Sequence, residues 1–209
     1  MRSIIKDTGK DLLIYFALCA ATFGMLLTIA QYSSMQTDVG FLQFKQEYIN
    51  IGIWRAAFYT HVFSSLLTLC AGFTQFSSYV LKHHKKLHRL VGKIYAYDVL
   101  LINVPAGMIM AIYANGGITS KIAFITLDCL WFLFTYMAVA AIRVKDIKKH
   151  KRFMIRSYAL TFSAITLRTW KAIFSHTPID PDTLYMINAW MGFLPNWLFA
   201  EWLIRKKLF

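Results

Sequence analysis

Three ionisable side chains lie within apolar stretches of the sequence, where a charge is expensive: His61, Asp128 and Arg168. Ionisable residues inside a membrane are rare and usually functional. A pair between Arg168 and Asp128 would offset the cost of burying either charge, and His61 beside it would titrate near neutral pH. These residue types predict a proton-coupled carrier or a small-ligand site, with a purely structural salt bridge as the alternative.

The helical rise places these three groups at one depth. Counting about 1.5 Å per residue from the ends of the apolar stretches puts each of them about 10–12 Å below the outer membrane boundary. His61 also heads a stripe of small and polar residues at helical spacing that includes Gln75, which we assign to the same outer layer. Such a stripe is equally typical of a seam between packed helices.

A second set of residues lies toward the opposite side of the membrane. His88 and His150 are each followed closely by arginine, in the sequences HR and HKR. Asp98 is expected to pair with Arg156 and so to join two helices, although Arg152 and Arg156 could instead extend toward lipid headgroups. Five residues are assigned to the support of this inner layer: Arg89, Arg152, Arg156, Asp98 and Asn103.

The elements that must position these residues are membrane-spanning helices. The chain is 57% hydrophobic and 16% charged, whereas a soluble domain carries about 25% charged residues. Its apolar runs have the length of about 20 residues that a helix needs to cross a bilayer. The sequence therefore predicts an all-α integral membrane protein, a six-transmembrane-helix bundle formed by one domain over residues 1–209. The expected spans are residues 12–30, 54–80, 93–113, 120–142, 154–176 and 184–204.

The distribution of charge predicts the orientation of this bundle. The net charge is +13, and Lys and Arg cluster before the first span and after the second, fourth and sixth. The positive-inside rule then puts both termini in the cytoplasm of a multi-pass protein of the cell inner membrane. The basic face is expected to bind anionic lipid headgroups, and it argues against nucleic acid as a partner because topology already explains the charge.

Other features predict shape more than chemistry. Pro105 and Pro195 lie within spans and should kink their helices, and residues 31–53 are long enough to form a short cap over the outer end of the bundle. The three cysteines lie inside spans without CxxC spacing, so neither a disulfide nor a metal site is expected. No Gly-rich phosphate loop, HExxH or GxSxG motif occurs in the sequence.

Three motifs carry a resemblance to a known family. They are an in-span His61 followed by GxxQF at residues 72–76, then HRxxGxxY at residues 88–95, and HxRxMxRxxALTxxxxxxR at residues 150–168. In this combination the chain resembles an uncharacterised family of bacterial predicted membrane proteins, over residues 54–170. The resemblance implies a membrane architecture and no assigned activity.

The chain also resembles, less closely, the six-helix b-type cytochromes of the ascorbate-reducible kind. Helix number, cytoplasmic termini and histidines on the second, third and fifth helices are similar. The resemblance implies that His88 and His150 would ligate a haem b on the cytoplasmic side, with His61 belonging to an outer haem. The fourth helix departs from the pattern because it has Asp128 and no histidine.

Three hypotheses about function remain open on the sequence. The protein is a b-type-cytochrome-like or quinone-reactive electron-transfer subunit, or it is a proton-coupled carrier or small-ligand-binding bundle that uses His61, Asp128 and Arg168. In the third hypothesis it is a non-catalytic accessory subunit of a larger membrane complex, in which the polar stripes serve packing alone.

Overall fold

The computed structural model describes residues 2–207, with the side chains of residues 2–11, 13 and 14 excepted. Every regular element in this range is helical. The elements are α1 (Arg2–Ala30), η1 (Gly40–Lys45), α2 (Gly52–Gln75), α3 (Ser78–His83), α4 (Lys85–Asp98), η2 (Val99–Asn103), α5 (Val104–Ile112), α6 (Gly117–Arg143), α7 (Ile147–Thr161), α8 (Ser163–Phe174), α9 (Pro181–Met191) and α10 (Leu194–Arg205).

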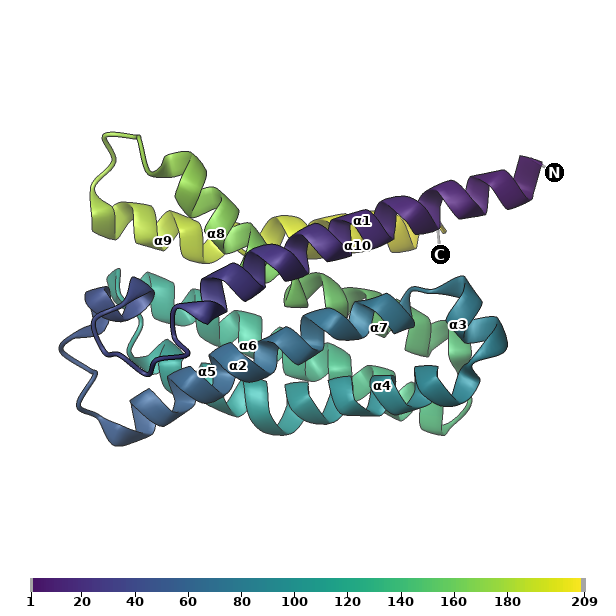
Figure 1. Cartoon of the computed structure of the whole chain (residues 1–209), viewed down its shortest axis with the longest axis horizontal. Helices are drawn as coiled ribbons and strands as arrows, with labels where there is room; N and C mark the ends of the chain where they lie inside the picture. The colour runs from purple at the N-terminus through teal and green to yellow at the C-terminus, as the bar shows by residue number, and fades with distance from the viewer. Residues whose placement is uncertain (1, 208–209) are drawn as a thin grey trace.

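The helices lie roughly along one axis in two layers. In the view of Figure 1, α2, α4, α5, α6 and α7 form the lower layer, and α1, α8, α9 and α10 cross above it. The beginning of α1 and the end of α10 lie at the same end of the molecule, the end at which α3 also lies (Figure 1). Because the described chain begins and ends at the same end of the molecule, it must run along the length of the molecule an even number of times.

Within residues 2–207, three continuous helices are long and apolar enough to cross a membrane: Gly52–Gln75, Lys85–Ile112 and Gly117–Arg143. The second of them joins α4, η2 and α5, and a shorter apolar helix runs over Tyr15–Ala30. The all-helical fold and these helices confirm the predicted class. The six spans and the cytoplasmic termini stay predictions, and Met1 and residues 208–209 lie outside the described residues.

The last two predicted spans are each interrupted. The fifth divides into α7 and α8 at Phe162, and the sixth divides into α9 and α10 at Gly192 and Phe193. Pro195 stands in the first turn of α10, as Pro105 does in α5, because a proline lacks the N–H that a helix interior requires. Both prolines therefore coincide with breaks in regular α-helix, as the sequence predicts.

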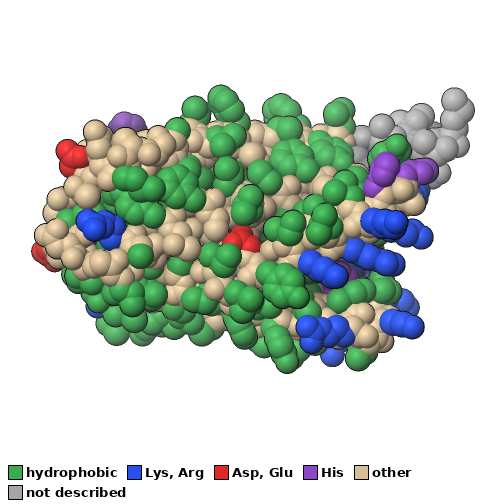
Figure 2. All heavy atoms as spheres, turned by 60° about the horizontal axis from the view of Figure 1, so that its bottom comes forward, with side chains coloured by type: hydrophobic (Ala, Val, Ile, Leu, Met, Phe, Trp, Pro, Cys, Tyr) green, Lys and Arg blue, Asp and Glu red, His purple; other side chains and the backbone are tan. Residues whose placement is uncertain are grey.

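Charge and apolar surface are separated along the molecule. Figure 2 shows Lys and Arg side chains gathered at one end, while hydrophobic side chains are spread over the face between the ends. The basic residues at this end include Lys82, Lys85, Lys86, Arg89, Lys149 and Arg152, all exposed. Leu101, 67% exposed, and Tyr136, 54% exposed, are examples of the apolar surface. An apolar belt beside a charged end is typical of a protein that lies in a membrane.

Residues 31–51 fold over the opposite end of the bundle. Within this segment η1 places Leu42 and Lys45 in the interior, with 0% and 2% exposed. The ammonium of Lys45 donates hydrogen bonds to the carbonyl oxygen of Tyr113 and to Oδ1 of Asn115, at the end of α5. It also lies 5.2 Å from the ring centroid of Tyr48. The predicted cap is therefore present and is attached to the bundle through a buried lysine.

Burial lowers the pKa of Lys45 from 10.5 to about 8. Between these two values the unfolded chain binds a proton that the folded protein has released, so folding stability is expected to rise with pH. We predict that Lys45→Met weakens this rise, whereas Lys86→Met on the exposed loop does not. Melting temperatures in detergent from neutral to alkaline pH measure the difference, and equal slopes for wild type and Lys45→Met would contradict the prediction.

Candidate functional site

Two imidazoles lie at the basic end of the bundle, and the first belongs to α7. Asp146 caps this helix by accepting a hydrogen bond from the backbone N–H of Lys149 at 2.9 Å, which fixes the turn that carries His150. Nδ1 of His150 lies 2.8 Å from the carbonyl oxygen of Ala138 on α6. Because a carbonyl can only accept, Nδ1 must hold a proton, which makes Nε2 the nitrogen that could offer a lone pair to a ligand.

The second imidazole, His88, belongs to the first turns of α4. Its Nδ1 is buried without a hydrogen-bond partner of normal geometry among the described residues, and the backbone of Thr74 is a weaker hydrogen-bond partner of the ring. The ring interacts electrostatically with His150 and Arg89. The structure thus places His88 of α4 and His150 of α7 at the same end of the bundle, near enough for their charges to interact, with Arg89 also nearby. That they hold a cofactor stays a prediction.

Gln75 contacts this inner pair and not the outer layer to which the sequence assigned it. Its Nε2 donates a hydrogen bond of 2.9 Å to the carbonyl oxygen of His88. A methyl group on Gly92 would lie 3.1 Å from its Oε1, so glycine there allows α2 and α4 to approach. The correction follows from length, because fourteen residues separate Gln75 from His61, which is about 21 Å along a helix.

A buried hydrogen-bond network extends from α4 into α6 and α7. The hydroxyl of Tyr95 lies 2.7 Å from Oγ of Ser157 and 3.0 Å from Oγ1 of Thr161, and it accepts from Nε1 of Trp131 at 3.3 Å. Oγ of Ser157 also lies 2.7 Å from Oγ1 of Thr135. Sequence reasoning missed this network. The available signal was the tyrosine that ends HRxxGxxY, seven residues and two helical turns after His88.

Gly72, the glycine of the GxxQF motif in α2, lies where α2 packs against α7. Tyr158 donates a hydrogen bond of 2.5 Å to the carbonyl oxygen of Leu69, and its ring lies over Gly72. A methyl group on Gly72 would overlap this hydroxyl and would lie 2.9 Å from Leu18. The three motifs therefore meet in space: they are the surfaces along which α2, α4 and α7 pack.

Arg156 pairs with Glu201 on α10, so the predicted pair between Arg156 and Asp98 is wrong. The guanidinium is bidentate, with Nε 2.5 Å from Oε1 and Nη2 2.9 Å from Oε2, and Trp197 also donates to Oε1 at 3.2 Å. The ring of Phe153 lies 5.3 Å from the same cation. Sequence reasoning missed Glu201, although an acidic residue within the last apolar run was a visible signal.

The predicted ion pair between Arg168 and Asp128 is also absent from the described residues. Nη1 of Arg168 donates to the carbonyl oxygen of Ala164 at 2.7 Å. Asp128 is 5% exposed and lies against Gly107, where a methyl group would meet its Oδ2 at 2.7 Å. The cause is geometric: Asp128 faces α5, whereas α8 turns away after Phe162 and packs on α1 and α9.

His61 keeps its place in the outer layer. Its Nδ1 lies 3.3 Å from the carbonyl oxygen of Asn103, and Arg168 acts on it electrostatically. The partners found for His61 are thus a carbonyl and a cation, which does not match the second imidazole that an outer haem would need.

Arg168 lines a groove of ≈ 410 Å³ between α1 and α8. The other lining residues are mostly small or apolar: Ala20, Ala21, Gly24, Met25 and Thr28 on α1, and Ile165, Thr169, Ala172 and Ile173 on α8. A guanidinium has five N–H donors, of which the bond to Ala164 uses one. The groove therefore combines an apolar wall with a charged donor.

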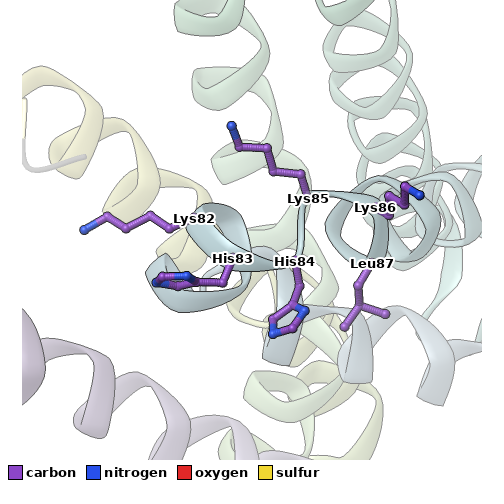
Figure 3. Close-up of a pocket in the computed structure, with 6 residues that line it drawn as sticks. All are labelled: Lys82, His83, His84, Lys85, Lys86 and Leu87. Carbon is purple, nitrogen blue, oxygen red and sulfur yellow. The ribbon is translucent and has the colours of Figure 1, made fainter.

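A second hollow, of ≈ 550 Å³, lies at the loop that joins α3 and α4. Figure 3 shows that the side chains around it come from consecutive residues, Lys82 to Leu87, and spread in different directions. They do not converge on one point, which is typical of a solvated loop. This loop suits contact with anionic headgroups better than it suits a specific ligand.

The comparison with protein families gives one match. The model of the family described as predicted membrane protein (DUF2306) matches residues 58–204. No curated protein and no solved structure matches the chain. The match covers α3 to α9 and most of α2 and α10, and so it includes His61, the histidine pair and all three motifs. The chain therefore belongs to this family of predicted membrane proteins, which has no known function.

Proposed function

We propose that the protein is a membrane electron-transfer protein that binds a haem b between His88 and His150. The observation that carries the proposal is that these two imidazoles, from different helices, lie near enough to interact electrostatically. Pairs of imidazoles from facing helices are how helical bundles hold haem. When bound, the haem supplies one-electron chemistry that no side chain of this site offers.

The donor atoms fit such a group. His150 donates a hydrogen bond from Nδ1 to the carbonyl oxygen of Ala138. This bond orients the ring and leaves Nε2 available as a ligand. The buried Nδ1 of His88 lacks a partner of normal geometry, and an unsatisfied buried polar atom calls for an explanation. Arg89 and Arg152 add positive charge at this level, which suits a ligand that carries carboxylates.

The orientation in the membrane belongs to the same proposal. We infer that the end bearing the Lys and Arg cluster of Figure 2 faces the cytoplasm of an inner-membrane protein, where anionic headgroups contact it. Six crossings, with α7–α8 and α9–α10 each counted as one broken span, agree with the termini lying at one end (Figure 1). The haem would then lie on the cytoplasmic side.

The absorption spectrum of detergent-purified protein from haem-replete cells tests the proposal. We expect a Soret band that moves on reduction with dithionite, together with the sharp visible bands of a low-spin b-type haem. A colourless preparation, with no spectral change on reduction, would exclude haem-based electron transfer.

A small-ligand function of the outer layer is the second candidate, and the groove at Arg168 favours it. The groove has the character of a site for an amphiphile with an apolar body and a carbonyl or anionic head, such as a quinone. Arg168 would bind the head, and His61, which does not line the groove, interacts electrostatically with Arg168. Eighteen residues, or up to about 27 Å of helix, separate Arg168 from His150, so this site would act apart from the haem.

Binding of a short-chain ubiquinone analogue distinguishes the second candidate. We expect the analogue to raise the melting temperature of the wild type and of Thr169→Ala, which lines the same groove without a charge. Arg168→Gln should lose most of this shift because the head group loses its cationic donor. An equal shift in Arg168→Gln would mean that the analogue binds elsewhere.

A further inference from the structure

A buried hydrogen bond joins α4, the helix that carries His88, to α7, the helix that carries His150. On α4, Tyr95 follows His88 by seven residues, and the π-helical turn at Val99–Asn103 begins only after it. On α7, Ser157 follows His150 by the same number of residues. Residues seven apart lie on one face of an α-helix, about 10 Å apart along it. The bond of 2.7 Å between Tyr95 and Ser157 therefore lies on the faces that carry the two histidines.

The directions of the hydrogen bonds around Tyr95 follow from the number of protons. Oγ1 of Thr135 donates to the carbonyl oxygen of Trp131 at 2.7 Å, so with its single proton it accepts from Oγ of Ser157. The proton of Ser157 is then used, and Tyr95 must donate the bond between them. Nε1 of Trp131 donates to the same tyrosine hydroxyl at 3.3 Å. Tyr95 thus donates to α7 and accepts from α6.

Burial makes these bonds exacting. Tyr95 is 1% exposed, and Ser157 and Thr135 are each 0% exposed. Without the tyrosine hydroxyl, Trp131 would lose an acceptor and Ser157 would lose a donor inside the bundle. Buried polar groups are costly to leave unpaired. The fully bonded arrangement therefore favours one rotation of α4 against α6 and α7.

Helix α6 supports His150 directly as well. Ala138 follows Thr135 by three residues, so the two are neighbours on the surface of α6. The carbonyl oxygen of Ala138 accepts the hydrogen bond from Nδ1 of His150 at 2.8 Å. The same stretch of α6 thus orients the ring of His150 and, through Tyr95, holds the helix that carries His88.

We propose that Tyr95 is a positioning residue for the histidine pair, whose hydroxyl sets the rotation at which α4 presents His88 beside α7. What the two rings hold rests on the proposed haem function, whereas the relation between the helices is a property of the chain alone. The orientation of axial imidazoles tunes a haem, so rotation of α4 would change its spectrum and its potential.

Electron paramagnetic resonance of the oxidised protein compares Tyr95→Phe with the wild type. We expect the g values of the low-spin ferric signal to shift in this variant, together with the midpoint potential, because the angle between the two imidazole planes changes. Tyr158→Phe is the matched control. It also removes a buried hydroxyl, from a ring whose centroid lies 6.0 Å from that of Tyr95, but the lost bond runs to Leu69 on α2. Both variants should lower stability, and the control should keep the wild-type signal and potential.

Nitroxide labels report on the helices whether or not haem is bound. Lys86→Cys on α4 and Lys151→Cys on α7 provide exposed attachment sites, in a chain whose three native cysteines are replaced by alanine. Double electron–electron resonance then measures the distance between the labels. We expect the distance distribution to shift or broaden in Tyr95→Phe and to stay unchanged in Tyr158→Phe. If every variant lacks haem, this difference still supports the positioning role, and the proposed function alone fails.

Ser157→Ala breaks the same bond from the other side and replaces Tyr95→Phe if that variant does not fold. It should change the label distances in the same way. Distances that match the wild type in both variants, or that change equally in Tyr158→Phe, would overturn the positioning role. So would a haem signal in Tyr95→Phe that is identical to that of the wild type.

Discussion

Replacing both His88 and His150 by alanine is expected to abolish the Soret band of the purified protein. The two rings lie within electrostatic reach of each other, His150 uses Nδ1 for its hydrogen bond to Ala138, and Nδ1 of His88 has no hydrogen-bond partner of normal geometry. Each single replacement would leave one of the two histidines that would hold the haem, so haem should be weakly held and largely lost during purification. Haem content per chain, measured by pyridine haemochrome, gives the comparison.

The loop between α3 and α4 offers the matched control. His83 and His84 lie a few residues from His88, yet they project from an exposed turn (Figure 3). The variant His83→Ala/His84→Ala also removes two imidazoles from the same end of the molecule, and it should keep the full haem content. If this control loses haem while His88→Ala/His150→Ala keeps it, the ligands have been assigned to the wrong pair.

Substitution of Gly72 by alanine should destabilise the protein by about 1–3 kcal/mol, the usual cost of overpacking a core. The added methyl group would overlap the hydroxyl of Tyr158, which must move and would give up its bond to Leu69. Motion of Tyr158 would in turn disturb the aromatic contact with Phe76, whose ring centroid is 4.8 Å away. Unfolding by a denaturing detergent, followed by circular dichroism, measures the loss.

The same helix contains the control for this prediction. A methyl group added to Gly52, at the start of α2, would have nothing within 4 Å. The variant Gly52→Ala should be neutral, or slightly stabilising because alanine favours helix by up to about 1 kcal/mol over glycine. A similar loss in both variants would show that close approach to Tyr158 is not what requires glycine at position 72.

The membrane class and the long helices could be predicted from the sequence because apolar composition over about 20 residues reports directly on helices that cross a bilayer. The observed helix boundaries differ from the predicted span boundaries at the basic segment between the second and third spans. The third span was expected to begin at residue 93, yet α4 begins at Lys85, because basic residues at a helix end do not prevent helix formation. The second ended at Gln75 and not at residue 80, since Ser77 caps a separate short helix.

The partners of the buried charges were predicted less well. Helical rise gives the depth of a residue, but the direction in which a side chain points depends on how helices rotate against one another. Arg156 lay at the right depth for Asp98 and nevertheless reached Glu201 on α10. Asp128 and Arg168 were placed in one layer, and the interruption at Phe162 directed α8 elsewhere. His88 and His150 came together because each begins a helix at the same end of the bundle.

The π-helical turn at Val99–Asn103 has a further consequence for how this helix tolerates change in length. Such a turn holds one residue more than the α-helix around it, so deletion of a single residue there could restore regular helix without shortening the membrane crossing appreciably. A π-helical turn rotates less per residue than an α-helix, so one residue fewer at about 100° per residue covers nearly the same total rotation. Tyr95 would keep its neighbours, and Gly107 would still face Asp128. The turn therefore accommodates an extra residue without changing the rotational register between the two halves of the helix.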